Sequence, residues 1–248
     1  LSEMRSKLAI NLTMNYSINF NLPKRSKKKI IFIIIHYTGM KNELEAIKRL
    51  CDYRSNVSSH YFVKNNGEIL NLVPDLYEAW HAGKSSWKHY RFLNRFSIGI
   101  EVSNPGHEHG YKKFNSSQIS SLIKLLKYLQ KKYNVKSQNI LGHSDIAPDR
   151  KKDPGEKFPW RKLANKNLCK WHNLSSVKMK KNRNIKVSLF EKKIFFRNLK
   201  KIGYSKIGKI KDNSYEINVV KAFQRKFRQN LINGKIDQEC LLISKNLL

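Results

Sequence analysis

Two histidines and one aspartate in this chain have the types and spacing to hold a metal ion. His143 and Asp153 lie ten residues apart in the segment GHSDIAPDRKKDPG, whose glycines and prolines favour a turn-rich loop able to wrap an ion. His36 follows the apolar run IFIII, which is typical of a buried strand, so we expect it at the carboxyl end of that strand. Two imidazoles and a carboxylate suit zinc, and three protein ligands leave the fourth tetrahedral position for water, as in a catalytic site.

Hydrophobic spacing predicts the elements that must position these residues. Asn42 can cap a helix whose apolar positions are Leu44, Ile47, Leu50 and Cys51. The dipeptide Asn66-Gly67 between two apolar runs predicts an antiparallel hairpin. The remaining predicted elements of this part are a strand over 97–102, a helix from residue 115 or 116 to about 133, and a short strand near 140–141 that leads into the His143 loop.

Four motifs of this chain, in their order and spacing, match one family. The segments HYT, AWHAG, SIGIE and GHSDIAPDRKKDPG resemble the zinc-dependent N-acetylmuramoyl-L-alanine amidases of type 2. That family includes the peptidoglycan recognition proteins and certain phage lysozyme-amidases. The likeness spans roughly Ile30 to Leu163, and it implies an α/β fold with a central mixed β-sheet flanked by helices.

The resemblance also implies roles for individual residues. It makes His36, His143 and Asp153 the ligands of one zinc ion. Glu101, in SIGIE, matches an essential acid of the bacterial members, and a carboxylate there can take a proton from the attacking water and return it to the leaving amine. Lys151 matches a lysine that stabilises the oxyanion, although a solvated charge is the rival interpretation and the adjacent Lys152 is a second candidate.

Three further residues are predicted to contact substrate. Trp80 and His81, in AWHAG, resemble a groove wall that contacts the sugar or the stem peptide; a place for Trp80 in the core is the alternative. His60 lies where some relatives carry a tyrosine near the metal.

The chain is long enough for one sizeable domain and a small one. We expect a zinc amidase domain over 1–169, with its core at about 30–163, a linker over 170–184, and a helical domain over 185–248. The last part has the spacing of three helices, and it resembles the small peptidoglycan-binding module that accompanies wall hydrolases. The linker is expected because KWHNLSSVKMKKNRN has no acidic residue and no clear periodicity.

The amino-acid composition argues against several classes of protein. The formal net charge of +32 favours polyanionic partners, but the basic residues are spread along the chain and form no nucleic-acid-binding motif, so no specific nucleic-acid partner is expected. Cys51, Cys169 and Cys240 are too few and too scattered for a disulfide framework or a thiolate metal cluster. No stretch has the length and apolarity of a transmembrane segment, and the amino terminus lacks the continuous apolar core of a signal peptide.

We therefore expect a monomeric zinc enzyme that hydrolyses the amide bond between N-acetylmuramic acid and L-alanine in peptidoglycan or muropeptides, in wall turnover or recycling. The alternative is a peptidoglycan receptor that keeps the fold and binds without cutting. The appended wall-binding module favours the periplasm or cell envelope, with the cytoplasm as the alternative compartment.

Overall fold

The computed structural model describes residues 12–14, 16–205 and 213–248. They divide into two compact units. The first unit combines residues 1–81 with 94–136, and the second combines 82–93 with 137–248.

The first unit is built on strands whose apolar residues are buried on both faces. Five strands of a six-stranded mixed sheet lie in it, in the order β1 (Leu12–Met14), β5 (Ile69–Asn71), β4 (Tyr61–Val63), β9 (Ser97–Val102), β3 (Phe32–Tyr37). Strands β3, β9 and β4 run parallel, β5 is antiparallel to β4, and β1 is parallel to β5. Residues Phe32 to Ile35 are 1% exposed or less, as expected for a central strand covered on both faces.

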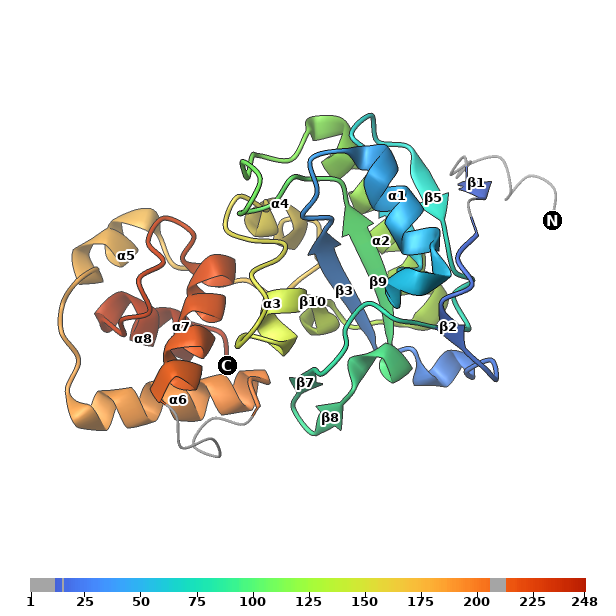
Figure 1. The fold of residues 1–248 in the computed structure, drawn as a ribbon. Helices are drawn as coiled ribbons and strands as arrows, with labels where there is room; N and C mark the ends of the chain where they lie inside the picture. The colour runs from blue at the N-terminus through green and yellow to red at the C-terminus, as the bar shows by residue number, and fades with distance from the viewer. Residues whose placement is uncertain (1–11, 15, 206–212) are drawn as a thin grey trace. The chain divides into compact units, whose positions relative to one another are not determined.

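Helices α1 (Glu43–Cys51) and α2 (Ser116–Tyr133) cover opposite faces of these strands (Figure 1). On one face, Ala46 and Leu50 of α1 pack with Phe62 of β4. Tyr61 points the other way because successive strand residues alternate, and its hydroxyl and that of Tyr133 on α2 both donate to Asp75, each at 2.6 Å. The unit also contains the strand pair β2 (Phe20–Asn21) and β6 (Glu78–Ala79).

The second unit is mainly helical. Its short elements are β7 (Ser86–Trp87), β8 (Tyr90–Arg91), β10 (Ile140–Gly142), α3 (His143–Ile146) and α4 (Trp160–Ala164). They are followed by α5 (Ser176–Asn182), α6 (Leu189–Ile202), α7 (Asn213–Phe227) and α8 (Gln238–Asn246). Phe195 and Phe223 meet edge to face at 5.3 Å between ring centroids, and both are fully buried in the core that α6, α7 and α8 share. Short 3-10 turns span Lys27–Lys29, Tyr53–Ser55, Leu93–Phe96 and Ser137–Asn139.

Most predicted elements are confirmed. The α/β class, the mixed sheet with flanking helices and the Asn66-Gly67 hairpin are present, and Asn42 caps α1 by accepting from the backbone N–H groups of residues 44 and 45. The prediction that Leu44 lies on the apolar side of α1 is wrong, because Leu44 is 63% exposed while Ala46 takes the buried position. The segment 170–184 contains helix α5. Within the described parts of the chain, no helix has the length and apolarity to cross a membrane.

Candidate active site

Strands β3 and β9 place His36 and Glu101 side by side. These two residues are partners in the parallel register, so their side chains project from the same face at the carboxyl ends of the strands. His36 is 1% exposed, and Glu101 is half-buried. The apolar run before His36 forms the strand that the sequence predicted, and the strand delivers the imidazole beside the predicted catalytic acid.

His81 lies against His36 and fixes its orientation. Nε2 of His36 and Nδ1 of His81 are 3.1 Å apart, and Nε2 of His81 is 3.1 Å from the hydroxyl of Ser97. The ring of His81 rests on Gly99, where a Cβ would come within 2.4 Å of the imidazole, so only glycine leaves room for it. Metal-binding histidines commonly hold their second ring nitrogen in such a hydrogen bond, which fixes both tautomer and orientation.

The second unit positions His143 and Asp153. His143 is the first residue of α3, and its Nδ1 is 3.1 Å from Oδ2 of Asp153. Its Nε2 is 3.3 Å from the carbonyl oxygen of Ala82. The backbone N–H of Ser144 donates to the carbonyl of Asp153 at 2.9 Å, which ties the two ends of the loop together. His143 is 3% exposed and Asp153 is 6% exposed.

The chemistry of these donors fits a cation. A carbonyl oxygen only accepts, so Nε2 of His143 carries the hydrogen in its contact with Ala82, and Nδ1 is the ring atom that faces Asp153. This nitrogen lies 3.1 Å from Oδ2 of Asp153, and an imidazole nitrogen and a carboxylate oxygen are both metal-ligand atoms. A divalent metal satisfies both.

His36, His143 and Asp153 each offer a ligand atom, and these atoms all lie within 4.8 Å of one another. The three predicted ligands therefore form a buried group that can bind a metal ion. Two nitrogens and one carboxylate oxygen form a donor set that zinc prefers.

A buried network holds the turn that carries His143. Asp145 is 2% exposed and accepts from the Tyr204 hydroxyl at 2.7 Å, from Lys226 Nζ at 2.9 Å and from the backbone N–H of Gly142 at 2.9 Å. Burial, followed by the charge of Asp145, raises the pKa of Tyr204. Residues after α6 and on α7 therefore fix the position of α3.

The sequence analysis missed these positioning residues. Asp145 stands two residues after His143 inside a recognised motif, and an acidic residue there was the available signal. Tyr204 and Lys226 lie 59 and 81 residues further along the chain, so no local spacing could connect them to Asp145.

Arg150 is another residue that the sequence analysis did not single out. Its guanidinium donates to the carbonyls of Ala82 at 2.5 Å and Lys84 at 2.9 Å. Arg150 therefore fixes the position of the Ala82 carbonyl, which also contacts Nε2 of His143.

The other predicted site residues occupy different environments. Trp80 is half-buried and its Nε1 donates to the Asn21 side chain at 3.0 Å. Lys151 is half-buried in the loop between the two ligands of the second unit. His60 is fully buried: its Nδ1 accepts from the backbone of Gly99, and its Nε2 contacts Arg25 at 3.1 Å. Burial, aided by the charge of Arg25, lowers the pKa of His60 to about 3, so this ring stays neutral inside the fold.

Comparisons with known proteins agree with this geometry. The family model described as N-acetylmuramoyl-L-alanine amidase matches residues 26–156. The N-acetylmuramoyl-L-alanine amidase AmiD of Escherichia coli is 34% identical over 232 residues, covering 89% of this chain and 83% of AmiD.

Two solved structures resemble more than nine-tenths of the chain. The complex of E. coli AmiD with anhydro-N-acetylmuramic acid-L-Ala-D-gamma-Glu-L-Lys aligns with a TM-score of 0.76 at 32% identity, over 92% of each chain. AmpDH3 from Pseudomonas aeruginosa in complex with anhydromuramic pentapeptide aligns with a TM-score of 0.77 at 28% identity, over 95% of this chain and 97% of AmpDH3. The chain therefore belongs to the N-acetylmuramoyl-L-alanine amidase family of enzymes.

Proposed function

We propose that this amidase uses one zinc ion, held by His36, His143 and Asp153, to hydrolyse the amide bond between N-acetylmuramic acid and L-alanine in cell-wall turnover or recycling. The observation that carries the proposal is the buried group of two imidazoles and a carboxylate within 4.8 Å, in a chain of the amidase family. The muropeptides named in the AmiD and AmpDH3 complexes support a muropeptide substrate.

The residues around the ligands have separate parts in the proposed reaction. Zinc, when bound, supplies Lewis acidity that polarises the scissile carbonyl and makes water more acidic. Glu101, the register partner of His36, takes the proton of the attacking water and returns it to the nitrogen of the leaving L-alanine. Lys151 stabilises the negative charge that develops on the carbonyl oxygen.

Among the residues predicted to contact substrate, Trp80, His81 and His60, a direct contact is proposed for Trp80. Trp80 is the most accessible of the three, since its indole is only half-buried. His81 is 8% exposed and contacts His36, so it would act mainly by orienting that ligand. His60 has no exposed surface, and its geometry supports a structural part better than direct contact with substrate.

We also propose that residues 1–169 form the catalytic domain, 170–184 a connecting segment and 185–248 a wall-binding helical domain that attaches the enzyme to peptidoglycan. Arg183 in the connecting segment pairs with the buried Glu239 of α8 at 2.7 Å through two nitrogens. This bidentate pair holds the segment firmly against the last helix. The enzyme is proposed to act as a monomer.

The proposed compartment is the periplasm or cell envelope, where a wall-binding domain has its ligand; the cytoplasm is the alternative. Fractionation of cells that express the natural gene at its own level decides between them. Recovery of the protein solely with cytoplasmic markers would exclude an envelope location.

The function is tested with anhydro-N-acetylmuramic acid carrying a tripeptide. Products are separated by liquid chromatography and identified by mass, before and after removal of metal with a chelator. The proposal predicts a free peptide that begins at L-alanine, its loss on chelation and its return with zinc. Cleavage at another bond, or an undiminished rate in fully metal-free protein, contradicts it.

A further inference from the structure

Helix α6 begins with two large apolar side chains that lie in solvent. Leu189 is 77% exposed, more than any other large apolar residue in the part of the chain that the structure describes, and Phe190 is 70% exposed. The helix does not need this apolar pair for its own stability, because the first turn of a helix is stabilised by acidic residues and polar caps. Neighbouring apolar side chains that remain exposed mark a surface that binds a partner or a membrane.

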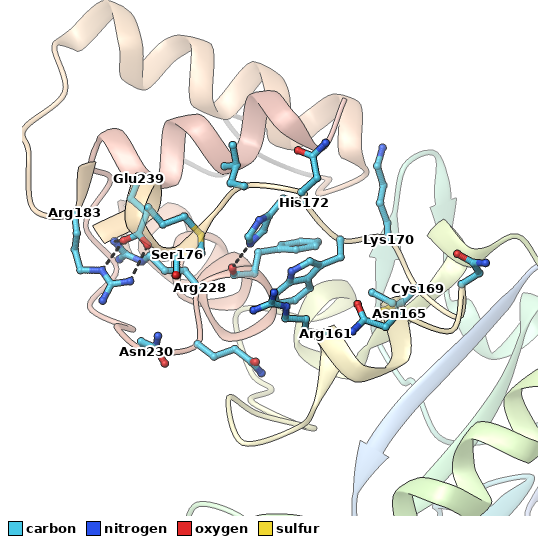
Figure 2. Close-up of a pocket in the computed structure, with 18 residues that line it drawn as sticks. Arg161, Asn165, Cys169, Lys170, His172, Ser176, Arg183, Arg228, Asn230 and Glu239 are labelled. Atoms are coloured by element: carbon cyan, nitrogen blue, oxygen red, sulfur yellow. Dashed lines mark hydrogen bonds and ion pairs between the residues drawn. The ribbon is translucent and has the colours of Figure 1, made fainter. Parts of the chain in front are cut away.

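The apolar pair stands on a fixed helix end. The backbone N–H of Ser188 donates to the Glu191 carboxylate at 2.7 Å, and the N–H of Glu191 donates to the Ser188 hydroxyl at 3.2 Å. The Gln238 side chain of α8 donates to the same carboxylate at 2.8 Å. The segment before α6 is also tied to α8, by the ion pair of Arg183 with Glu239 that Figure 2 draws as dashed lines. Contacts within α6 and to α8 therefore hold the apolar pair in place at the surface.

The side of α6 that carries the apolar pair also carries four cations. The opposite side is buried, since Phe195 and Leu199 have no exposed surface and face the other helices of the core (Figure 1). Side chains three or four residues apart share one face of a helix, so the exposed face continues from the apolar pair through a set of basic residues. This basic face consists of Lys193, Arg197, Lys200 and Lys201, all of them exposed. It extends along about 12 Å of the helix, at 1.5 Å per residue.

Charge and apolarity together select the partner of this surface. Glu191 is the only acidic residue in α6, and Ser188 and Gln238 already occupy its carboxylate. An exposed array of positive charge attracts polyanions of any kind. The apolar pair narrows the choice, because a nucleic acid or a charged polysaccharide would leave both side chains in water. An anionic bilayer satisfies both features: its phosphates attract the cations, and the boundary between headgroups and acyl chains takes up the leucine and the phenylalanine.

We propose that this face of α6 docks the enzyme on an anionic phospholipid surface. The apolar pair enters the boundary between headgroups and acyl chains, and the basic face lies on the phosphates. A helix of 14 residues is too short to cross a bilayer, so α6 lies in the plane of the surface. None of these residues is a proposed metal ligand or catalytic group, so lipid binding is a property separate from hydrolysis.

The test is cosedimentation of the full chain with lipid vesicles. Wild type should bind vesicles of phosphatidylethanolamine and phosphatidylglycerol, and should not bind vesicles of phosphatidylcholine alone. Leu189→Ser combined with Phe190→Ser should weaken binding at least about tenfold, because burial of the two side chains in the boundary is lost. Lys193→Gln combined with Lys200→Gln should weaken it about 30-fold, from about 1 kcal/mol per cation near an anionic surface.

Two matched controls lie on other helices. Lys124→Gln combined with Lys127→Gln removes two exposed cations from α2, and Leu44→Ser removes an exposed leucine from α1. Both controls should bind the anionic vesicles within about threefold of wild type, because solvent ions screen charges that lie away from the docked face. Every substituted side chain is exposed, so all variants should unfold at the same urea concentration as wild type.

Fluorescence locates the contact directly. Phe190→Trp should bind as wild type does, and vesicles that contain brominated lipid should quench its emission more strongly than that of wild type. The proposal is overturned if wild type does not bind anionic vesicles, or if the double serine variant binds them as tightly as wild type. Loss of binding in the charge variant alone identifies a general polyanion surface and likewise excludes lipid docking.

Discussion

Replacing Lys226 with methionine should destabilise the turn that carries His143. Lys226 is 4% exposed, and its Nζ lies 2.9 Å from Oδ2 of Asp145. At that separation the attraction is about 6 kcal/mol with an effective dielectric constant of about 20, before the cost of desolvating both charges. Removal of one partner leaves Asp145 buried with an uncompensated charge. The expected loss in the free energy of unfolding is about 3–5 kcal/mol.

Urea unfolding of the full chain, with metal removed from every sample, measures this loss. Lys221→Met on the same helix is the matched control and should change the free energy of unfolding by less than about 1 kcal/mol. Adding Asp145→Asn to the Lys226→Met variant should cost less than Asp145→Asn alone, because the two residues are coupled. Zinc should also bind more weakly to Lys226→Met, since Asp145 and His143 share α3. A loss below about 1 kcal/mol with no coupling would refute the reasoning.

Three other changes separate the roles of the site residues. Glu101→Gln should retain zinc, as measured by metal analysis, but lose at least about 100-fold in kcat; a wild-type rate would end its assignment as the proton carrier. Asp153→Asn should weaken zinc binding at least about tenfold in competition with a chelator, and unchanged affinity would remove it from the ligand set. His60→Gln should flatten the pH dependence of stability, because the pKa of His60 is about 3 in the fold against 6.5 in the unfolded chain. The stabilising contribution of neutral His60 is complete above pH 6.5 and is lost as the pH falls toward 3. Wild type should therefore lose about 2 to 3 kcal/mol between pH 6.5 and 4.5 that the variant keeps, by urea unfolding; parallel curves would contradict this.

The sequence predicted the elements with strong local signals. Strand β9 begins and ends where the apolar run indicated, and α2 begins after Asn115, where a polar cap precedes the helical spacing. The three proposed metal ligands could be predicted because each stands in a motif with a turn or a strand end beside it. Their approach to one another was an inference from the family resemblance, and the structure brings their ligand atoms within 4.8 Å.

Contacts between segments far apart along the chain could not be predicted from the sequence. Helix α5 was missed because SVKMKKN has few apolar residues; Ser175 caps it, and the neighbouring Arg183 is held by Glu239 of α8. Leu44 has a core-forming side chain, yet the orientation of α1 turns it to solvent. The buried position of His60 depends on the backbone N–H of Gly99 and the carbonyl of Tyr77, neither of which is near it in sequence.

The central claim is that a single zinc ion bound by His36, His143 and Asp153 is required for amide hydrolysis. Metal-free protein should be titrated with zinc while bound metal and the rate of L-alanyl peptide release are measured on the same sample. The account predicts that the rate rises in proportion to bound zinc and reaches its plateau at one ion per chain. Full activity with no metal bound, or one tightly bound zinc per chain without hydrolysis, would contradict it.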